Sequence, residues 1–260
     1  MKIALQLLQF RKSTTRHIST SDLTSYLAVT HISNDVNFLG KQAQAWMRPS
    51  AVPTVESAIG MSGTACNIRL LAGRLHEAHL LVNSKPLSET IRQLDKPFQR
   101  RTSDFDESLQ RLSECRRAFT RRCNSDQTLA TLRNKSAFHI GHADFGEALG
   151  DVDENIELAE YLGDIHGNTF FAAAELVALA RMTHHLNGEL VVALTSVRDH
   201  VLNVAADYQR FAVAFASAFA QRYMYKYLTQ IYSEKNTIEV EAGPVVNMNY
   251  FVDISTMQLA

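Results

Sequence analysis

The residues best suited to chemistry in this sequence lie together between Arg133 and His139. Histidine titrates near neutral pH, so His139 could act as a general base or a general acid. Arg133 carries a permanent charge and can bind a phosphate through two parallel hydrogen bonds. Asn134 could orient either side chain, and Lys135 could add electrostatic attraction. These residue types indicate a candidate site for chemistry at a phosphate group.

The spacing of the two principal residues constrains such a site. Each residue of an α-helix turns by ~100°, so side chains six positions apart point about 120° away from one another. Arg133 and His139 therefore cannot share one face of an undistorted helix. Either the helix deforms between them or a second subunit completes the site.

A basic segment precedes this motif. Residues 92–135 contain eleven Lys and Arg against six Asp and Glu. The pairs Arg116-Arg117 and Arg121-Arg122 lie one to two helical turns apart, which could align their charges with a phosphate backbone. A solvated helix face without any ligand would produce the same pattern, so both interpretations stay open.

The elements expected to position these residues are α-helices. Pro and Gly are scarce, at 5 and 11 residues, and apolar side chains recur every three or four positions. Long helices are predicted over residues 23–47, 55–82, 105–122, 170–186 and 189–232. A shorter helix is expected over 87–94. Another should follow Ser125 or Asp126 and carry the motif, ending before Gly141.

Capping residues set the expected boundaries of these helices. Asp22 and Thr54 are the expected N-caps of the first two, and Ser103 or Asp104 that of the helix over 105–122. Pro86 is expected to mark the end of the second helix.

The C-terminal sequence has a different pattern. Thr237 to Glu241 alternates apolar and polar residues, and β-branched and aromatic residues follow over 245–254, which predicts a small hairpin. The expected fold is therefore all-α, a bundle of five to seven helices. Its expected segments are an N-terminal arm and long helix (1–53), the bundle (54–235) and a C-terminal tail or hairpin (236–260).

Composition excludes several classes of protein. Hydrophobic residues make up 46% and charged residues 20%, as in soluble globular proteins. A formal net charge of −1 provides no global attraction to nucleic acid. Three scattered cysteines fit neither a disulfide framework nor a zinc site, so we expect a cytoplasmic protein with reduced thiols. Residues 144–164 carry eight acidic side chains and no Lys or Arg, and we expect them to compensate the basic segment.

Targeting signals and membrane spans are not expected either. The apolar start of the chain is interrupted by Gln6 and Gln9 and has no small-residue cleavage site, unlike a secretory signal. No apolar run approaches ~18 residues, so we expect no membrane association.

The segment from Arg133 to His139 resembles the signature of the HEPN superfamily, an Arg followed by a polar residue and then by a His four to six residues later. The helical context over roughly 55–190 is also similar. The resemblance implies an RNA-directed protein, specifically a metal-independent endoribonuclease of the toxin or antiviral-defence type. It implies catalytic roles for Arg133 and His139, a supporting role for Asn134, and a homodimer that joins two motifs. RNA and an antitoxin protein are the other implied partners.

In this interpretation, Lys135 and the four arginines of the basic segment would bind RNA. The predicted RNA-binding residues are Lys135, Arg116, Arg117, Arg121 and Arg122. We expect no metal or other cofactor. His76 and His79 lack one residue of the His-Glu-x-x-His spacing and are therefore a weak zinc candidate.

A protein of another class remains the alternative prediction. Aromatic residues of 208–232, including Phe215 and Phe219, recur at helical spacing, which is typical of a core or a helix-pairing surface. A non-catalytic interaction or scaffold protein could oligomerise through this C-terminal helix. In that case, polar replacement of Phe215 or Phe219 should dissociate the oligomer.

Overall fold

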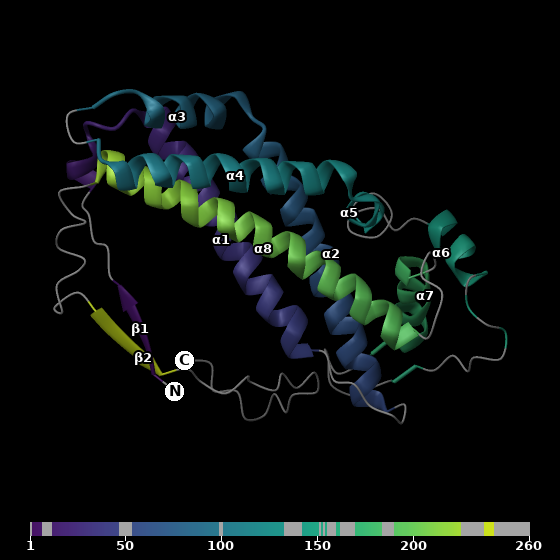
Figure 1. Ribbon diagram of the computed structural model, residues 1–260. Helices are drawn as coiled ribbons and strands as arrows, with labels where there is room; N and C mark the ends of the chain where they lie inside the picture. Colours follow the sequence, from purple (N-terminus) through teal and green to yellow (C-terminus); the bar gives the residue numbers. More distant parts are fainter. Residues whose placement is uncertain are drawn as a thin grey trace. The chain divides into compact units, whose positions relative to one another are not determined.

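A computed structural model describes residues 2–6, 12–46, 54–98, 101–132, 142–150, 152, 154, 160–161, 170–183, 190–224 and 237–241. These residues form eight α-helices, a 3-10 helix and a two-stranded sheet, so the all-α class predicted from the sequence is confirmed (Figure 1). The helices are α1 (Thr20–Trp46), α2 (Val55–Val82), α3 (Lys85–Asp95), α4 (Ser103–Ser125), α5 (Gln127–Thr131), α6 (His142–Leu149), α7 (Ala172–Thr183), α8 (Leu190–Tyr223) and the 3-10 helix η1 (Lys12–Thr15). None of the helices in this described part is long and apolar enough to span a bilayer.

Side-chain caps begin the first two helices. The backbone N–H of Asp22 donates to Ser19 Oγ at 3.0 Å, and Ser19 Oγ donates to the Asp22 carboxylate at 2.8 Å. Ser19 therefore precedes α1 as its cap, and the prediction of Asp22 is wrong by three residues. Asp22 lies in the first turn, where a negative charge favours the helix N-terminus. Thr54 caps α2 as predicted, because Thr54 and Ser57 exchange hydrogen bonds of 2.9 and 3.1 Å.

The next two helices begin earlier than their apolar patterns predicted. Ser84 caps α3 by accepting from the N–H of Leu87 at 3.3 Å. Pro86 lies in the first turn of α3, where its missing N–H is not needed. Thr102 caps α4 by accepting from the N–H of Phe105, so the predicted caps Ser103 and Asp104 are wrong by one or two positions. Caps of this type are easily misplaced because Ser, Thr and Asp cluster around each helix start.

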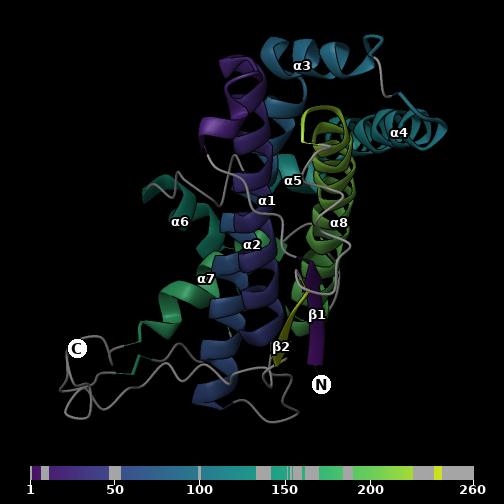
Figure 2. The ribbon, with the colours of Figure 1, turned by 90° about the vertical axis from the view of Figure 1, so that its left-hand side faces the viewer.

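The two strands come from opposite ends of the chain. Strand β1 (Lys2–Gln6) pairs antiparallel with β2 (Thr237–Glu241), with Ile3 opposite Val240 (Figures 1 and 2). The strand at 237–241 was predicted, and its observed partner was not. The expected hairpin partner, residues 245–254, lies outside the described residues.

The chain divides into two compact units, each of which is discontinuous in sequence. Unit 1 comprises Met1–Asn37, Arg74–Asp126 and Asn203–Pro244, and unit 2 comprises Phe38–Gly73, Gln127–Leu202 and Val245–Ala260. The sequence-based division at residues 53 and 235 remains a prediction.

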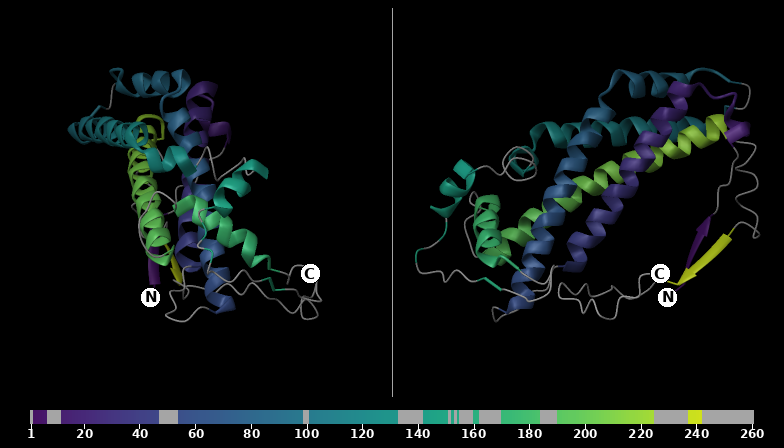
Figure 3. Two further views of the ribbon diagram at one scale, coloured as in Figure 1. Left: turned by 90° about the vertical axis from the view of Figure 1, so that its right-hand side faces the viewer. Right: turned by 180° about the vertical axis from the view of Figure 1, so that it is seen from behind.

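In unit 1, α8 packs against both α1 and α4 (Figure 3). The Tyr208 hydroxyl donates to the Val29 carbonyl at 2.9 Å, and the rings of Phe119 and Tyr208 lie 5.3 Å apart. Phe215 and Phe219 are fully buried in this core. These rings are therefore part of the core of the unit itself, and the dissociation of an oligomer by their polar replacement stays a prediction.

In unit 2, small residues allow α1 to approach its neighbours. A Cβ on Gly63 of α2 would lie 2.6 Å from the indole ring of Trp46 at the end of α1. A Cβ on Gly40 would lie 3.4 Å from the side chain of Leu202 on α8. Leu132, directly before Arg133, is fully buried.

Candidate functional site

The motif from Arg133 to His139 lies outside the described residues, and Asn134 and Lys135 lie outside with it. The described chain reaches this motif through α5 and the buried Leu132. The catalytic roles of Arg133, Asn134 and His139 therefore stay predictions, and so does the RNA-binding role of Lys135.

The basic face of α4, in contrast, is described in full. A groove of about 670 Å³ in unit 1 is lined by Arg116, Arg117 and Arg121 of this helix. Its remaining lining residues are all amides or hydroxyls: Asn83, Ser113, Thr120, Asn124 and Ser125. The α4 residues recur at three- and four-residue steps and so share one side of the helix. Among these lining residues there is no carboxylate, so the groove is a positively charged site.

Arg116 forms the structural part of this groove. Its Nε and Nη2 donate to the carbonyl of Val82 at 3.2 and 2.7 Å, and Nη2 also donates to Ser88 Oγ at 2.7 Å. Val82 is the last residue of α2, so Arg116 satisfies a terminal carbonyl and faces the negative end of the helix dipole. Burial lowers the pKa of this guanidinium, although an arginine remains charged at neutral pH.

Arg117 and Arg121 provide the available charge. Both side chains are exposed, and they lie one turn apart, which corresponds to a rise of about 6 Å along α4. Arg117 Nε donates a long hydrogen bond of 3.4 Å to the Ser113 carbonyl. Neither arginine forms an ion pair with any residue in the described ranges. Both charges can therefore be neutralised by an external anion.

One residue that lines the groove, Thr120, carries a buried hydroxyl group. Thr120 Oγ1 is inaccessible to solvent and forms no hydrogen bond within the part of the chain that the structure describes. Native proteins rarely leave such a group unpaired, because its desolvation costs about 1–3 kcal/mol. Because Thr120 lines the groove, this atom is one group that a bound polar ligand could satisfy after a small side-chain rotation.

The other two arginines on this helix do not line the groove. Arg122 forms an ion pair with Asp207 of α8, which is 5% exposed, and Asp207 also pairs with Arg210 at 2.5 Å. Arg111 is exposed, and its position on α4 is about 120° from that of Arg117. Of the four α4 arginines predicted to bind RNA, the structure brings Arg116, Arg117 and Arg121 together and directs Arg122 to an internal carboxylate.

The sequence suggested none of the amide and hydroxyl residues that line the groove, and among them Asn83 comes from outside α4. It directly follows α2, and its Nδ2 donates to the His79 carbonyl at 2.8 Å. An Asn just after a helix is a recognisable C-terminal signal, but its proximity to α4 depends on tertiary packing. Burial lowers the pKa of His79, so this nearby imidazole is neutral at pH 7. Among the described residues, no group of three or more His, Cys, Asp and Glu could hold a metal ion.

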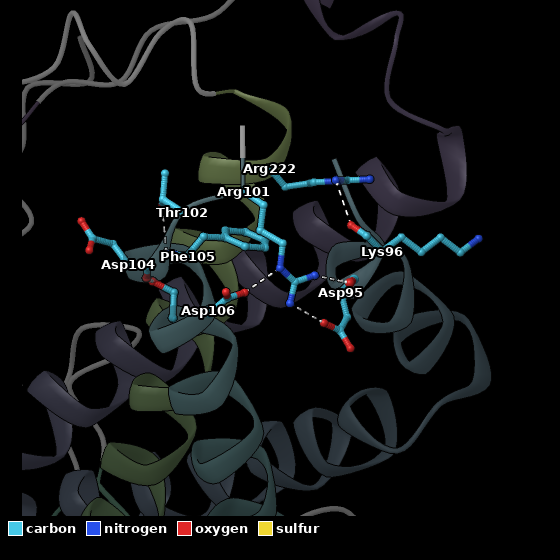
Figure 4. A network of polar contacts seen from close by, with 9 residues as sticks. Asp95, Lys96, Arg101, Thr102, Asp104, Phe105, Asp106 and Arg222 are labelled. Carbon is cyan, nitrogen blue, oxygen red and sulfur yellow. Dashed lines mark hydrogen bonds and ion pairs between the residues drawn. The ribbon is translucent and has the colours of Figure 1, made fainter. Parts of the chain in front are cut away.

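A second polar cluster differs from the groove because its central cation, Arg101, is paired with carboxylates. Arg101 donates to the carboxylates of Asp106 and Asp95 at 2.6 and 3.1 Å (Figure 4). Arg222 donates to the Lys96 carbonyl at 3.1 Å, and its guanidinium lies 4.2 Å from the centre of the Phe98 ring. These contacts fasten the connection between α3 and α4 to the end of α8, which is a structural role.

Comparison with known proteins adds no assignment. No family model matches this chain, and no curated protein or solved structure matches it. The chemistry of the α4 groove is therefore the main basis for a functional interpretation.

Proposed function

We propose that this protein binds RNA and that the α4 groove holds the phosphate backbone. The observation that carries the proposal is the pair Arg117 and Arg121, exposed in one groove and without a carboxylate partner among the described residues. Guanidinium groups bind phosphate oxygens through paired, charge-assisted hydrogen bonds. Arg116 adds a third positive charge beside them.

Local rather than global charge supports this proposal. The formal net charge of the chain is −1, so long-range attraction to a polyanion is weak. Binding would then depend on the few cations in the groove. Loss of two of them should consequently remove most of the affinity.

The test is fluorescence anisotropy with a labelled RNA of about 12 nucleotides at low salt. The double substitution Arg117→Ala and Arg121→Ala should weaken binding at least about tenfold, since hydrogen bonds to charged groups contribute about 1.5–3 kcal/mol each. Each single substitution, Arg117→Ala or Arg121→Ala, has Arg111→Ala as its matched control, because that variant also removes one positive charge from α4 and its side chain does not line the groove.

The control variant should retain affinity within about threefold, since single exposed charges have small effects. Equal affinity of the wild type and the double variant would reject the groove as the RNA site. Circular dichroism spectra of all variants should be the same, because the substituted side chains are exposed.

We further propose that bound RNA is cleaved without a metal ion by Arg133 and His139, with Asn134 in support. In this reaction the 2′-hydroxyl loses its proton to a base and attacks the adjacent phosphorus. The bond from phosphorus to the 5′-oxygen breaks, and an acid protonates that oxygen. The products are a 2′,3′-cyclic phosphate and a 5′-hydroxyl.

The residue types suit these steps. A neutral His139 could take the proton, a protonated His139 from a second copy could return one, and Arg133 could stabilise the charge on phosphorus. The six-residue offset between Arg133 and His139 favours such a homodimer. An RNA-cleaving protein also needs restraint in its own cell, so a neutralising antitoxin is part of this proposal.

Cleavage is tested separately from binding. Purified protein should degrade RNA in EDTA, and His139→Ala or Arg133→Ala should abolish the activity while helicity is retained. Binding without any cleavage would reject the catalytic proposal and leave the binding proposal intact.

If the protein is instead a non-catalytic scaffold, substitutions at Arg117, Arg121 and His139 should all leave its behaviour unchanged. Its oligomeric state, measured by light scattering, should then change with substitutions on exposed positions of α8, such as Val213.

A further inference from the structure

The ligand class of the α4 groove follows from what lines it and what does not. Its eight lining residues provide guanidinium, amide and hydroxyl groups, and no aromatic ring is among them. Proteins that hold the bases of single strands usually stack them on aromatic side chains, which contribute about 1–3 kcal/mol per base. The groove therefore offers contacts to phosphate and ribose and lacks this means of holding a base.

The number of phosphates follows from the arginines. Arg116 is held by three hydrogen bonds to Val82 and Ser88 and is therefore fixed at one wall. Arg117 and Arg121 remain exposed, about 6 Å apart along the helix axis. Each can neutralise one phosphate group of a strand that runs along α4.

The shape of the site favours one strand over a duplex. The groove is bounded by the end of α2 and one side of α4, and its cations lie within about two turns. Proteins that recognise double-stranded RNA contact successive grooves over about 16 base pairs, so they need widely separated cations. Two exposed cations this close together match neighbouring phosphates of one strand, and they do not span the successive grooves that duplex recognition uses.

We infer that the groove binds two consecutive phosphates of a single RNA strand and does not read base identity. This inference rests on the proposed function and specifies its substrate. Two neutralised phosphates set the dependence on salt, because the slope of log K against log salt is about −0.7 per phosphate for single strands. Between about 50 and 200 mM salt the affinity should fall about sevenfold.

The test uses three labelled probes in the same anisotropy assay: oligouridine, oligoadenosine and a duplex with an equal number of phosphates. The two single strands should bind within about threefold of each other, and the duplex should bind at least about tenfold more weakly. Arg117→Ala should reduce the salt effect from about sevenfold to about threefold, while Arg111→Ala should leave it unchanged.

The possible results distinguish this inference from the proposal that the protein binds RNA. Three results would overturn the inference alone. The duplex could bind as tightly as the single strands, one homopolymer could bind more than about tenfold more tightly than the other, or the salt slope could be much steeper. No binding to any of the three probes would instead overturn the proposed function. Binding that is insensitive to Arg117 and Arg121 substitutions would move the RNA site away from the groove and overturn both.

Discussion

Replacing Arg116 with methionine should test whether the groove wall depends on its hydrogen bonds. The substitution keeps an unbranched apolar side chain and removes the donors to Val82 and Ser88. The Val82 carbonyl ends α2, so it would lose its side-chain partner at a partly buried helix end. One charged hydrogen bond contributes about 1.5–3 kcal/mol, and we expect a loss of about 2 kcal/mol.

The assay is thermal unfolding followed by far-UV circular dichroism, with Arg117→Met as the matched control. For a chain of this size, 2 kcal/mol corresponds to a fall in Tm of about 4–8 °C. The control removes the same charge at the next position, where the side chain is exposed, and should stay within about 0.5 kcal/mol of wild type.

Salt distinguishes these hydrogen bonds from surface charge effects. The acceptors of Arg116 are an uncharged carbonyl and an uncharged hydroxyl, so the loss should persist at roughly 1 M salt, where exposed charges are screened. Equal Tm values for the Arg116 and Arg117 variants would refute the reasoning. So would a difference that disappears in salt.

Three other predictions concern packing and ionisation. Gly63→Ala should destabilise the protein by about 1–3 kcal/mol, because its Cβ would clash with the neighbouring indole. Gly146→Ala, with no described atom near its Cβ position, should instead stabilise the protein by up to about 1 kcal/mol. Urea unfolding in which both variants are more stable than wild type would contradict the first expectation. Burial raises the pKa of Tyr223 from 10.0 to about 12. The contribution of this hydroxyl to stability is therefore complete below pH 10 and is lost as the pH rises to 12. The free energy of unfolding of Tyr223→Phe should depend less on pH across this window than that of wild type. Burial also raises the pKa of the Cys123 thiol to about 12, so a disulfide reagent should modify the exposed Cys66 first. Mass spectrometry that finds Cys123 modified first would refute this expectation.

Local patterns in the sequence predicted the long helices and one side of the groove, but they did not predict α6. Three- and four-residue periodicity predicted α2 at its observed bounds, and it predicted α4 with only a few residues missing at either end. Periodicity works here because a helix must bury one face, and the buried positions therefore recur along the chain. The spacing of Arg117 and Arg121 on one side of α4 followed from the same geometry.

Contacts between distant segments could not be predicted in this way. The strand at 237–241 was evident from its alternation, but β1 as its partner depends on bringing the two ends of the chain together. Phe215 and Phe219 carried a pattern that fitted a core or an interface equally well. Their burial in unit 1 decided between the two, because neighbouring helices occupy that face.

The α4 arginines illustrate the division most clearly. The sequence by itself determined that a helix with clustered cations exists, because charge and period are local properties. Only the tertiary structure decided that Arg116 binds the Val82 carbonyl and that Arg122 pairs with Asp207. Whether a guanidinium forms internal hydrogen bonds depends on which acceptors the other helices place within hydrogen-bonding distance. Those acceptors come from helices far away in the sequence, so the exposed pair, Arg117 and Arg121, can be recognised only in the folded protein.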